Sequence, residues 1–226
     1  MKFIGIDYSL NSPAICSYDE KSNEYWFTSL SHNKKDCLDK KKISQGLIHH
    51  KNLFGLHGVD VMFYDRLGNS KDYITEQNNK IKDAVNVATL ISTYLEKNSV
   101  VGLEGFSYGS KGNSFIDIIF ANAILREYIY SMKTSKWLLE GPLVFTPSEI
   151  KKLAGKGNAN KLLMYKYFLE KGPSDTEFYK YVKSLDIEEN VPKPIDDLID
   201  AYWIEECTRQ YWYRETKCSV TPLVSI

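Results

Sequence analysis

The stretch FIGIDYSLNS, residues 3–12, carries an acidic residue, Asp7, at the end of an apolar run that has the character of a β-strand. Central strands of mixed sheets are usually apolar because helices cover both faces. An ionised carboxylate among apolar neighbours costs free energy unless another group pairs with it. A lone Asp near the start of a chain more often ends a strand or caps a turn than binds a cation. Asp7 therefore indicates a site only if other acids of the chain lie beside it.

The composition is that of a globular protein of ordinary polarity. The chain has 226 residues, of which 43% are hydrophobic and 26% are charged. This length predicts one domain over residues 1–226, with an insertion around 31–72 and a polar connection around 173–193. No apolar run approaches the ~18 residues that span a bilayer, and no signal peptide is expected. The four cysteines form no C-x-x-C pair, which favours a reducing, cytoplasmic location.

The order of strands and helices predicts an α/β protein. Hydrophobic patterns indicate three strands within residues 2–30, later strands at 99–106 and 142–147, and long helices at 74–98, 114–132 and about 194–213. Because the later strands follow helices, they are expected to be parallel. The predicted fold is a mixed five-stranded sheet, with antiparallel strands 1–3 and parallel strands 4–5, and with helices on both faces. VDVMFYD, at 59–65, could add a further strand.

Three further carboxylates form a pattern with Asp7. Glu104 ends the apolar strand VVGLE, at the position where functional groups emerge from α/β sheets. Asp197 and Asp200 stand three residues apart in PIDDLIDAYW, so they share one face of a helix. Asp196 lies about 100° round that helix, so we expect it to lie outside the site.

If the last helix packs across the sheet, these four carboxylates converge, and their mutual repulsion requires a cation. Mg²⁺ binds through a few carboxylates together with water and phosphate, and Mn²⁺ is expected to substitute for it. Four acids suit two ions ~3.5–4 Å apart, an arrangement that supports phosphodiester hydrolysis. The predicted catalytic and metal-binding residues are Asp7, Glu104, Asp197 and Asp200. The histidines, all predicted to be surface residues of the insertion, are His32, His49, His50 and His57.

Lysines and glycines in TPSEIKKLAGKGNANKLL, residues 146–163, indicate contact with phosphate. Glycines allow backbone N–H groups to approach a phosphate closely, and the N-terminus of a following helix favours an anion. A solvated helix face would explain the same lysines, and this alternative stays open. The spacing does not match a G-x-x-x-x-G-K-[ST] loop, so no nucleotide cofactor is expected. The candidate DNA-binding lysines are Lys151, Lys152, Lys156 and Lys161.

Taken in order, these motifs resemble those of RuvC-type Holliday junction resolvases, which belong to the retroviral-integrase and ribonuclease-H-like superfamily. That family has an Asp in a G-I-D setting, here Gly5-Ile6-Asp7, a Glu ending strand four, here Glu104, and D-x-x-D-A, here Asp197 to Ala201. It also has P-x-x-[VI]-K followed by G-x-G-x-A-x-K. The corresponding stretches begin at Pro147 and run from Gly155 to Lys161, with one residue fewer between them. The resemblance spans nearly the whole chain.

The resemblance implies a ribonuclease H-like fold and a crossover junction endodeoxyribonuclease that uses two Mg²⁺ ions to cut branched DNA. It implies a homodimer that matches the two-fold symmetry of a four-way junction, and a phage version would act in the host cytoplasm. It also implies that an aromatic residue just after the strand-four Glu stacks on unpaired bases. That residue is Phe106, with Tyr108 as its substitute and Lys111 nearby, although Phe106 could equally pack into the core. The zero net charge and the insertion depart from a family that is usually basic and shorter.

Other classes of protein remain as alternatives. A catalytically silent DNA-binding or packaging module could use the same fold, although the intact set of acids disfavours it. A general flap or nicking nuclease would need the same metal site without the junction preference. An actin-like or sugar-kinase ATPase can also begin with G-I-D, but such proteins need two domains of this kind, for which 226 residues leave too little room.

Overall fold

Six strands form one mixed sheet in the order β4-β3-β2-β1-β5-β6. The structure is a computed structural model that describes residues 1–9, 12–32, 49–67, 70–105 and 113–218, without the side chains of residues 113–115, 217 and 218. The strands are β1 (Lys2–Asp7), β2 (Ala14–Asp19), β3 (Glu24–His32), β4 (Val59–Tyr64), β5 (Ser99–Glu104) and β6 (Glu140–Phe145). The helices are α2 (Tyr73–Ser92), α3 (Asn113–Thr134), α4 (Pro147–Ala154), α5 (Lys161–Lys171), α6 (Glu177–Ser184) and α7 (Ile195–Cys218).

The first three strands form the antiparallel meander that the sequence predicts. β1 pairs with β2 from Lys2 opposite Asp19 to Asp7 opposite Ala14, and β2 pairs with β3 in the same antiparallel sense. In the turn between β2 and β3, Asn23 adopts a left-handed conformation with φ 58°. β5 runs parallel to β1, and β6 runs parallel to β5. The directions expected for these five strands are therefore confirmed.

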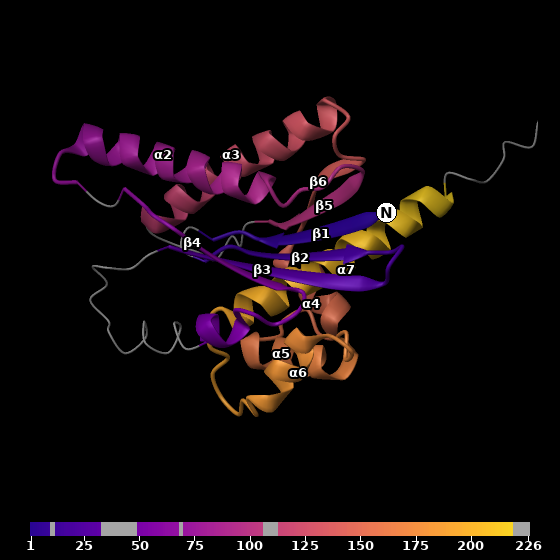
Figure 1. Ribbon diagram of the computed structural model, residues 1–226. Helices are drawn as coiled ribbons and strands as arrows, with labels where there is room; N and C mark the ends of the chain where they lie inside the picture. The colour runs from indigo at the N-terminus through magenta and orange to yellow at the C-terminus, as the bar shows by residue number, and fades with distance from the viewer. Residues whose placement is uncertain (10–11, 33–48, 68–69, 106–112, 219–226) are drawn as a thin grey trace, which may run out of the picture.

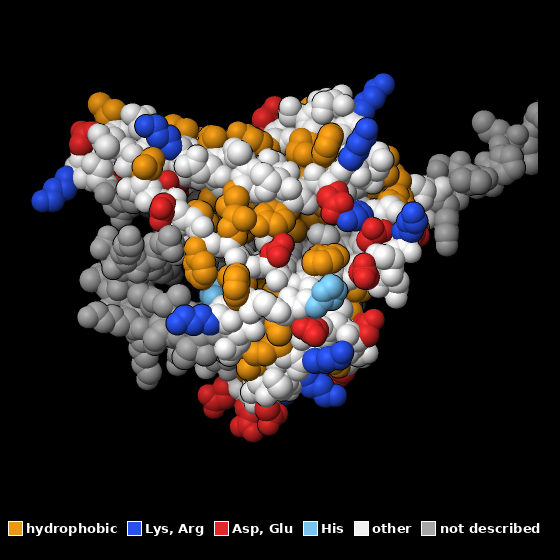
Figure 2. Space-filling model, in the orientation of Figure 1, with side chains coloured by type: hydrophobic (Ala, Val, Ile, Leu, Met, Phe, Trp, Pro, Cys, Tyr) orange, Lys and Arg blue, Asp and Glu red, His pale blue; other side chains and the backbone are white. Residues whose placement is uncertain are grey.

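A sixth strand corrects the expected five-stranded sheet. β4 lies at one edge and pairs in parallel with β3, up to Tyr64 opposite His32. Because an edge strand is only partly covered, its sequence lacks the continuous apolar run of a central strand. Hydrophobic side chains are exposed on the face shown in Figure 2, and Trp26 of β3 and Phe63 of β4 are 39% and 44% exposed. Residues 33–48 of the predicted insertion lie outside the described residues.

Helices cover both faces of the sheet, as predicted. α2 and α3 lie on one face, and α4 to α7 lie on the other (Figure 1). The core on the α2–α3 side includes Ile4, Ile6, Ile91, Leu103 and Leu125. The core on the α7 side includes Phe27, Phe168, Phe178, Leu198 and Ile204. No helix in the described ranges has the length and apolar character needed to cross a membrane.

The apolar period of residues 74–95 predicts a buried face that includes Ile74, Ile81, Ala88, Ile91 and Leu95, and the structure buries only the last three of these. Ile74 and Ile81 are 69% and 44% exposed, whereas Val87 is buried with the alanines beside it. The helix also ends at Ser92 rather than at the expected residue 98. The α-helix ends there because the next hydrogen bond spans a shorter turn: the N–H of Thr93 donates to the carbonyl oxygen three residues earlier instead of four.

The segment around 173–193, expected to be a polar connection, contains helix α6. This helix has only eight residues, so its polar face dominates the composition, yet it buries Phe178, Tyr179 and Val182. Among the histidines predicted to be exposed, His50 is instead buried, and its Nε2 lies 3.3 Å from the hydroxyl of Ser29. The region between β3 and β4 therefore contributes to the core as well as to the surface.

Helix α7 lies very close to the middle of the sheet, because β1 and β5 both present glycine there. Gly5 is paired with Gly102 in the parallel register. A Cβ atom on Gly5 would lie 2.2 Å from the backbone nitrogen of Glu205 and 2.3 Å from the carbonyl oxygen of Ala201. A Cβ atom on Gly102 would lie 1.9 Å from Oγ1 of Thr208. The two glycines set the depth of α7 and therefore the position of its first turns.

Candidate functional site

The ends of two neighbouring strands place two of the predicted acids side by side. Ile6 of β1 pairs with Leu103 of β5 in the parallel register. The next residues along the two strands are Asp7 and Glu104, which end β1 and β5. Two carboxylates therefore lie side by side at the C-terminal ends of these central strands, as the sequence predicts. This end of the strands is called the C-terminal edge of the sheet below.

Helix α7 brings the other two acids to this edge. It runs in the opposite direction to β1, because its C-terminal half packs on the start of that strand, with the Tyr213 ring 5.5 Å from the Phe3 ring. Its first turns therefore reach the end of β1. There the charges of Asp197 and Asp200 act directly on Asp7. All four predicted acids lie in one electrostatic environment, although their roles as ligands and catalysts stay predictions.

Burial and the repulsion of neighbouring charges raise the pKa values of Asp7, Glu104 and Asp200. Burial raises the pKa of Asp7 well above its usual range, and the charges of Asp197 and Asp200 raise it further. Burial also raises the pKa of Glu104 to about 7, with Asp200 contributing in the same direction. Burial likewise raises the pKa of Asp200. Four charges this close cannot all remain ionised without a compensating cation.

Two lysine side chains supply positive charge to the cluster. Lys161, the first residue of α5, forms an ion pair with Asp200, and its Nζ lies 3.7 Å from Asp196. Nζ of Lys193 lies 2.6 Å and 2.7 Å from the two carboxylate oxygens of Asp197. Desolvation opposes the charge of both lysines, but the surrounding carboxylates outweigh it and raise their pKa values.

Asp196 belongs to the same cluster, which corrects the prediction that its helical angle keeps it apart. Its Oδ2 lies 3.7 Å from Nζ of Lys161 and 3.9 Å from Nζ of Lys193. Burial, with the charge of Asp197, raises its pKa to about 6. Its Oδ1 is buried and has no hydrogen-bond partner among the described residues. The prediction failed because each lysine contacts Asp196 and also one of the other acids. The lysines therefore link carboxylates on different faces of α7.

The predicted site offers the type of donor atom that a hard divalent cation prefers, but not a ready-made arrangement of ligands. Within the described part of the chain, no group of three His, Cys, Asp or Glu side chains stands in an arrangement that could hold a metal ion. The predicted set consists of carboxylate oxygens only, of which Asp7 and Asp197 are buried, and ammonium groups pair with Asp197 and Asp200. Mg²⁺ and Mn²⁺ prefer such oxygen ligands. The residues that would hold them are Asp7, Glu104, Asp197 and Asp200.

The predicted DNA-binding lysines lie on α4, on the following loop and at the start of α5. Helix α4 begins with a capping box, in which the Thr146 hydroxyl accepts from the N–H of Glu149 and the Glu149 carboxylate accepts from the N–H of Thr146. Lys151 and Lys152 fall in its last turn, and Lys156 is exposed in the loop. This stretch places positive charge beside the acidic cluster, and its contact with DNA stays a prediction.

The two glycines of this loop differ in what they do. A Cβ atom on Gly155 would lie 2.3 Å from the ring of Tyr167, so a larger residue there requires this ring to move. A Cβ atom on Gly157 would lie 3.5 Å from the carbonyl oxygen of Ser148, which is an ordinary van der Waals contact, so packing does not exclude a side chain there. The presence of glycine at position 155 therefore has a packing reason, the Tyr167 ring, besides the predicted close approach to a phosphate.

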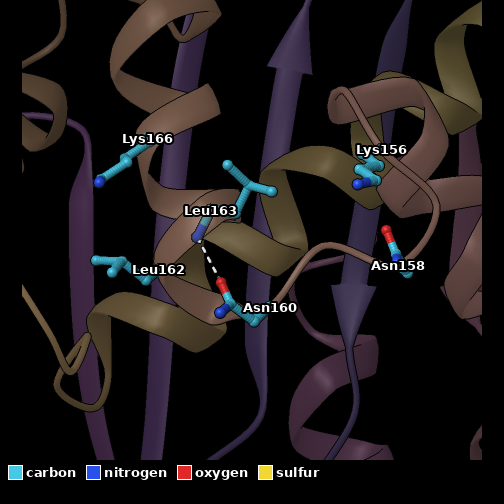
Figure 3. A pocket seen from close by; sticks show the side chains of 6 residues that line it. All are labelled: Lys156, Asn158, Asn160, Leu162, Leu163 and Lys166. Atoms are coloured by element: carbon cyan, nitrogen blue, oxygen red, sulfur yellow. Dashed lines mark hydrogen bonds between the residues drawn. The ribbon is translucent and has the colours of Figure 1, made fainter.

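A hollow of about 330 Å³ lies beside the loop and the start of α5. Its lining combines basic, amide and apolar side chains, which are Lys156, Asn158, Asn160, Leu162, Leu163 and Lys166. Figure 3 shows the Asn160 side chain accepting the hydrogen bond from the N–H of Leu163 that caps α5, at 2.9 Å. Lys156 and Lys166 lie on opposite sides of the hollow in this view. A lining of this kind suits phosphate and sugar groups.

The predicted loop residues Phe106, Tyr108 and Lys111 lie outside the described residues, so their roles stay predictions. Conversely, two site residues were missed by the sequence analysis. The hydroxyl of Ser12 donates to Oδ2 of Asp197 at 2.7 Å, and Lys193 holds the same carboxylate. Lys193 lies four residues before Asp197 but two residues before the start of α7, so helical spacing gave no signal for it.

Comparisons with known proteins give likeness to solved structures only. No family model matches the chain, and no curated protein matches it. Among solved structures, the chain is similar to the crystal structure of the yeast mitochondrial Holliday junction resolvase Ydc2, with a TM-score of 0.46 and 12% sequence identity, over 96% of this chain and 83% of that chain. A likeness at this level does not assign the chain to a family.

Proposed function

We propose that this chain is a divalent-metal-dependent endodeoxyribonuclease that cuts branched DNA, in particular four-way junctions, by phosphodiester hydrolysis. The observation that supports this most strongly is the gathering of Asp7, Glu104, Asp197 and Asp200 at the C-terminal edge of the sheet. The motif resemblance to RuvC-type resolvases supports the same assignment, because the same four acids form its pattern.

Each part of the site has a task in this reaction. The four carboxylates would hold two Mg²⁺ ions, which would supply activation of water and stabilisation of the leaving oxygen. Asp7 and Asp197 are only 9% and 3% exposed, so electrostatic interactions in the site are stronger than in water. Lys161 places a positive charge beside Asp200, where it can meet the reacting phosphate. The lysines of α4 and the following loop bind neighbouring phosphates.

Paired cutting of a junction requires two copies of the chain, and we propose a homodimer. A two-fold dimer would match the symmetry of the junction. The candidate contact is an apolar surface of α2 and α3, whose side chains are 44% to 73% exposed and are Tyr73, Ile74, Ile81, Ile116 and Phe120. An ion pair of 3.2 Å between Lys80 and Asp117 joins the two helices, so they can act as one surface.

The test is incubation with synthetic four-way junction, flap and linear duplex DNA, with Mg²⁺, with Mn²⁺ or with EDTA. We expect metal-dependent paired nicks in the junction and no cutting of the linear duplex. Asp7→Asn is the matched control, because it keeps the size of the side chain and removes its charge. It should lose at least ~10³-fold in cleavage, since metal stabilisation is worth several kcal/mol and ~1.4 kcal/mol is tenfold, while DNA binding is retained.

Other outcomes of the same experiment lead to other classes. Metal-dependent cutting of flaps with intact junctions would identify a general flap or nicking nuclease. Tight binding of branched DNA by the unmodified chain, without cutting in any metal, would identify a silent DNA-binding or packaging module.

A further inference from the structure

We infer that Lys193 is a positioning residue that holds Asp197 while no metal ion is bound, so that a divalent cation must displace its ammonium group in order to bind. This inference deepens the proposed function and rests on its metal site. It assigns a role to a residue that lies outside every motif on which the resemblance depends.

The contacts of Asp197 carry the inference. Nζ of Lys193 lies 2.6 Å from Oδ1 and 2.7 Å from Oδ2, so one ammonium group faces both oxygens. The hydroxyl of Ser12 donates to Oδ2 from 2.7 Å and lies 3.4 Å from the same Nζ. Such short distances are typical of charge-assisted hydrogen bonds. A Mg²⁺ ion binds carboxylate oxygens at ~2.0–2.1 Å, so the cation and the ammonium group compete for the same two atoms.

The two partners differ in their freedom to move. The Asp197 side chain is 5% exposed and is fixed in the first turn of α7, whereas the Lys193 side chain is 57% exposed. Lysine also has a long flexible stem and a strongly hydrated head group. Oδ2 of Asp196, 3.9 Å from Nζ, offers a second carboxylate for the displaced group. Lys193 is therefore the partner that leaves when a cation binds.

This competition has two consequences for the metal-free chain. Lys193 neutralises a carboxylate that is buried beside three others, so its removal leaves an uncompensated buried charge. The same contact must be broken before a cation binds, so it weakens the affinity for metal. A variant without the ammonium group should be less stable without metal and should bind metal more tightly.

The first experiment measures Mn²⁺ binding by calorimetry in the absence of DNA. Lys193→Met should bind about tenfold more tightly than the unmodified chain, because the cation no longer has to break a charge-assisted hydrogen bond. Lys151→Met is the matched control: its charge acts on Glu104 and Asp200, but it forms no ion pair with them among the described residues. Its effect should stay below about threefold, and Lys193→Arg should restore the weaker binding.

Two results would overturn the inference, and they are distinguishable. Equal effects of Lys193→Met and Lys151→Met would mean that only through-space charge matters, which leaves the metal site intact and removes the role of Lys193. Absence of Mn²⁺ binding by the unmodified chain and by every variant would overturn the proposed metal site itself, and the inference with it.

The second experiment needs no substitution, so it applies even if Lys193→Met does not fold. The amines of the unmodified chain are acetylated with an activated ester, and the rate at Lys193 is followed by mass spectrometry. Saturating Mg²⁺ should increase this rate several-fold, while the rate at Lys183, exposed in the last turn of α6, stays constant. A Lys193 rate that does not change with Mg²⁺, in protein that binds the ion, would overturn the displacement.

Discussion

Replacing Gly5 by alanine should force α7 away from the centre of the sheet and separate the acids of the cluster. The added Cβ atom would lie 2.2 Å from the nitrogen of Glu205 and 2.3 Å from the carbonyl oxygen of Ala201. Ordinary contacts of a Cβ atom begin near 3.4 Å, so about 1.2 Å has to be gained. Both clashing atoms are helix backbone, so no change of rotamer relieves them. Either α7 or β1 has to move.

The expected loss of stability follows from this geometry. Overpacking of a core costs ~1–3 kcal/mol where side chains can adjust, so a clash between backbones should cost about 3 kcal/mol or more. In a chain of this size ~1 kcal/mol corresponds to a change in Tm of ~2–4 °C, so thermal denaturation of Gly5→Ala should show a decrease of roughly 6–12 °C. Gly157→Ala is the matched control, because its Cβ atom would make only ordinary van der Waals contacts. Gly102→Ala should fall between the two, since the clashing Thr208 side chain can rotate.

Cleavage provides an independent readout of the same change. If the Gly5→Ala protein folds, Asp197 and Asp200 should move relative to Asp7, and junction cutting should fall with them. A Gly5→Ala protein within ~0.5 kcal/mol of the unmodified chain would refute the reasoning, because surface substitutions alone fall in that range. It would mean that α7 does not pack on β1 at this depth, and the gathering of acids would lose its structural basis.

In the metal-free chain, burial raises the pKa of Glu104 to about 7, so the folded state retains a proton above the unfolded pKa of ~4.3 and loses stability as the pH rises through this window. Glu104→Gln should therefore raise Tm at pH 8 but not at pH 4, and parallel pH profiles of the two proteins would contradict this. Lys151→Ala, Lys152→Ala and Lys156→Ala should each weaken DNA binding and flatten the plot of log K against log salt by about one unit in fluorescence anisotropy. Unchanged slopes for all three would mean that these lysines form a solvated face. Light scattering should show a dimer on junction DNA, which Ile81→Lys should prevent, and a monomer that leaves only singly nicked cruciform plasmid would count against paired cutting.

The central part of the fold could be predicted because its signals are local. β1 and β5 are apolar runs that each end in an acid, Asp7 and Glu104, and the spacing of Asp197 and Asp200 defines one helix face. These patterns depend only on neighbouring residues, so they placed the strands, their directions and the last helix. The order of the acids along the chain then indicated that they meet.

What could not be predicted depends on contacts between distant elements. Residues 59–65 were predicted only as a possible further strand, because β4 lies at a sheet edge, where a strand needs no continuous apolar run. The exposure of Ile81 depends on how α2 packs against α3, which its own period does not define. Asp196 and Ser12 join the cluster through the packing of α5 and of the segment after β1 around α7, and no short pattern encodes these contacts between distant parts of the chain. Lys193 contacts Asp197 across only four residues, but it lies before the start of α7, so the helical spacing of the acids does not include it.

The cluster unites residue 7 with residues 197 and 200, and this separation has a consequence during synthesis. Chains emerge from the ribosome at ~5–20 residues per second, so β1 appears many seconds before α7. Until α7 packs against Gly5 and Gly102, two of the four acids are missing from the C-terminal edge of the sheet. Under the proposed function, a nascent chain, or one terminated before α7, is therefore unable to nick DNA, because the nuclease becomes competent only when α7 has packed on β1.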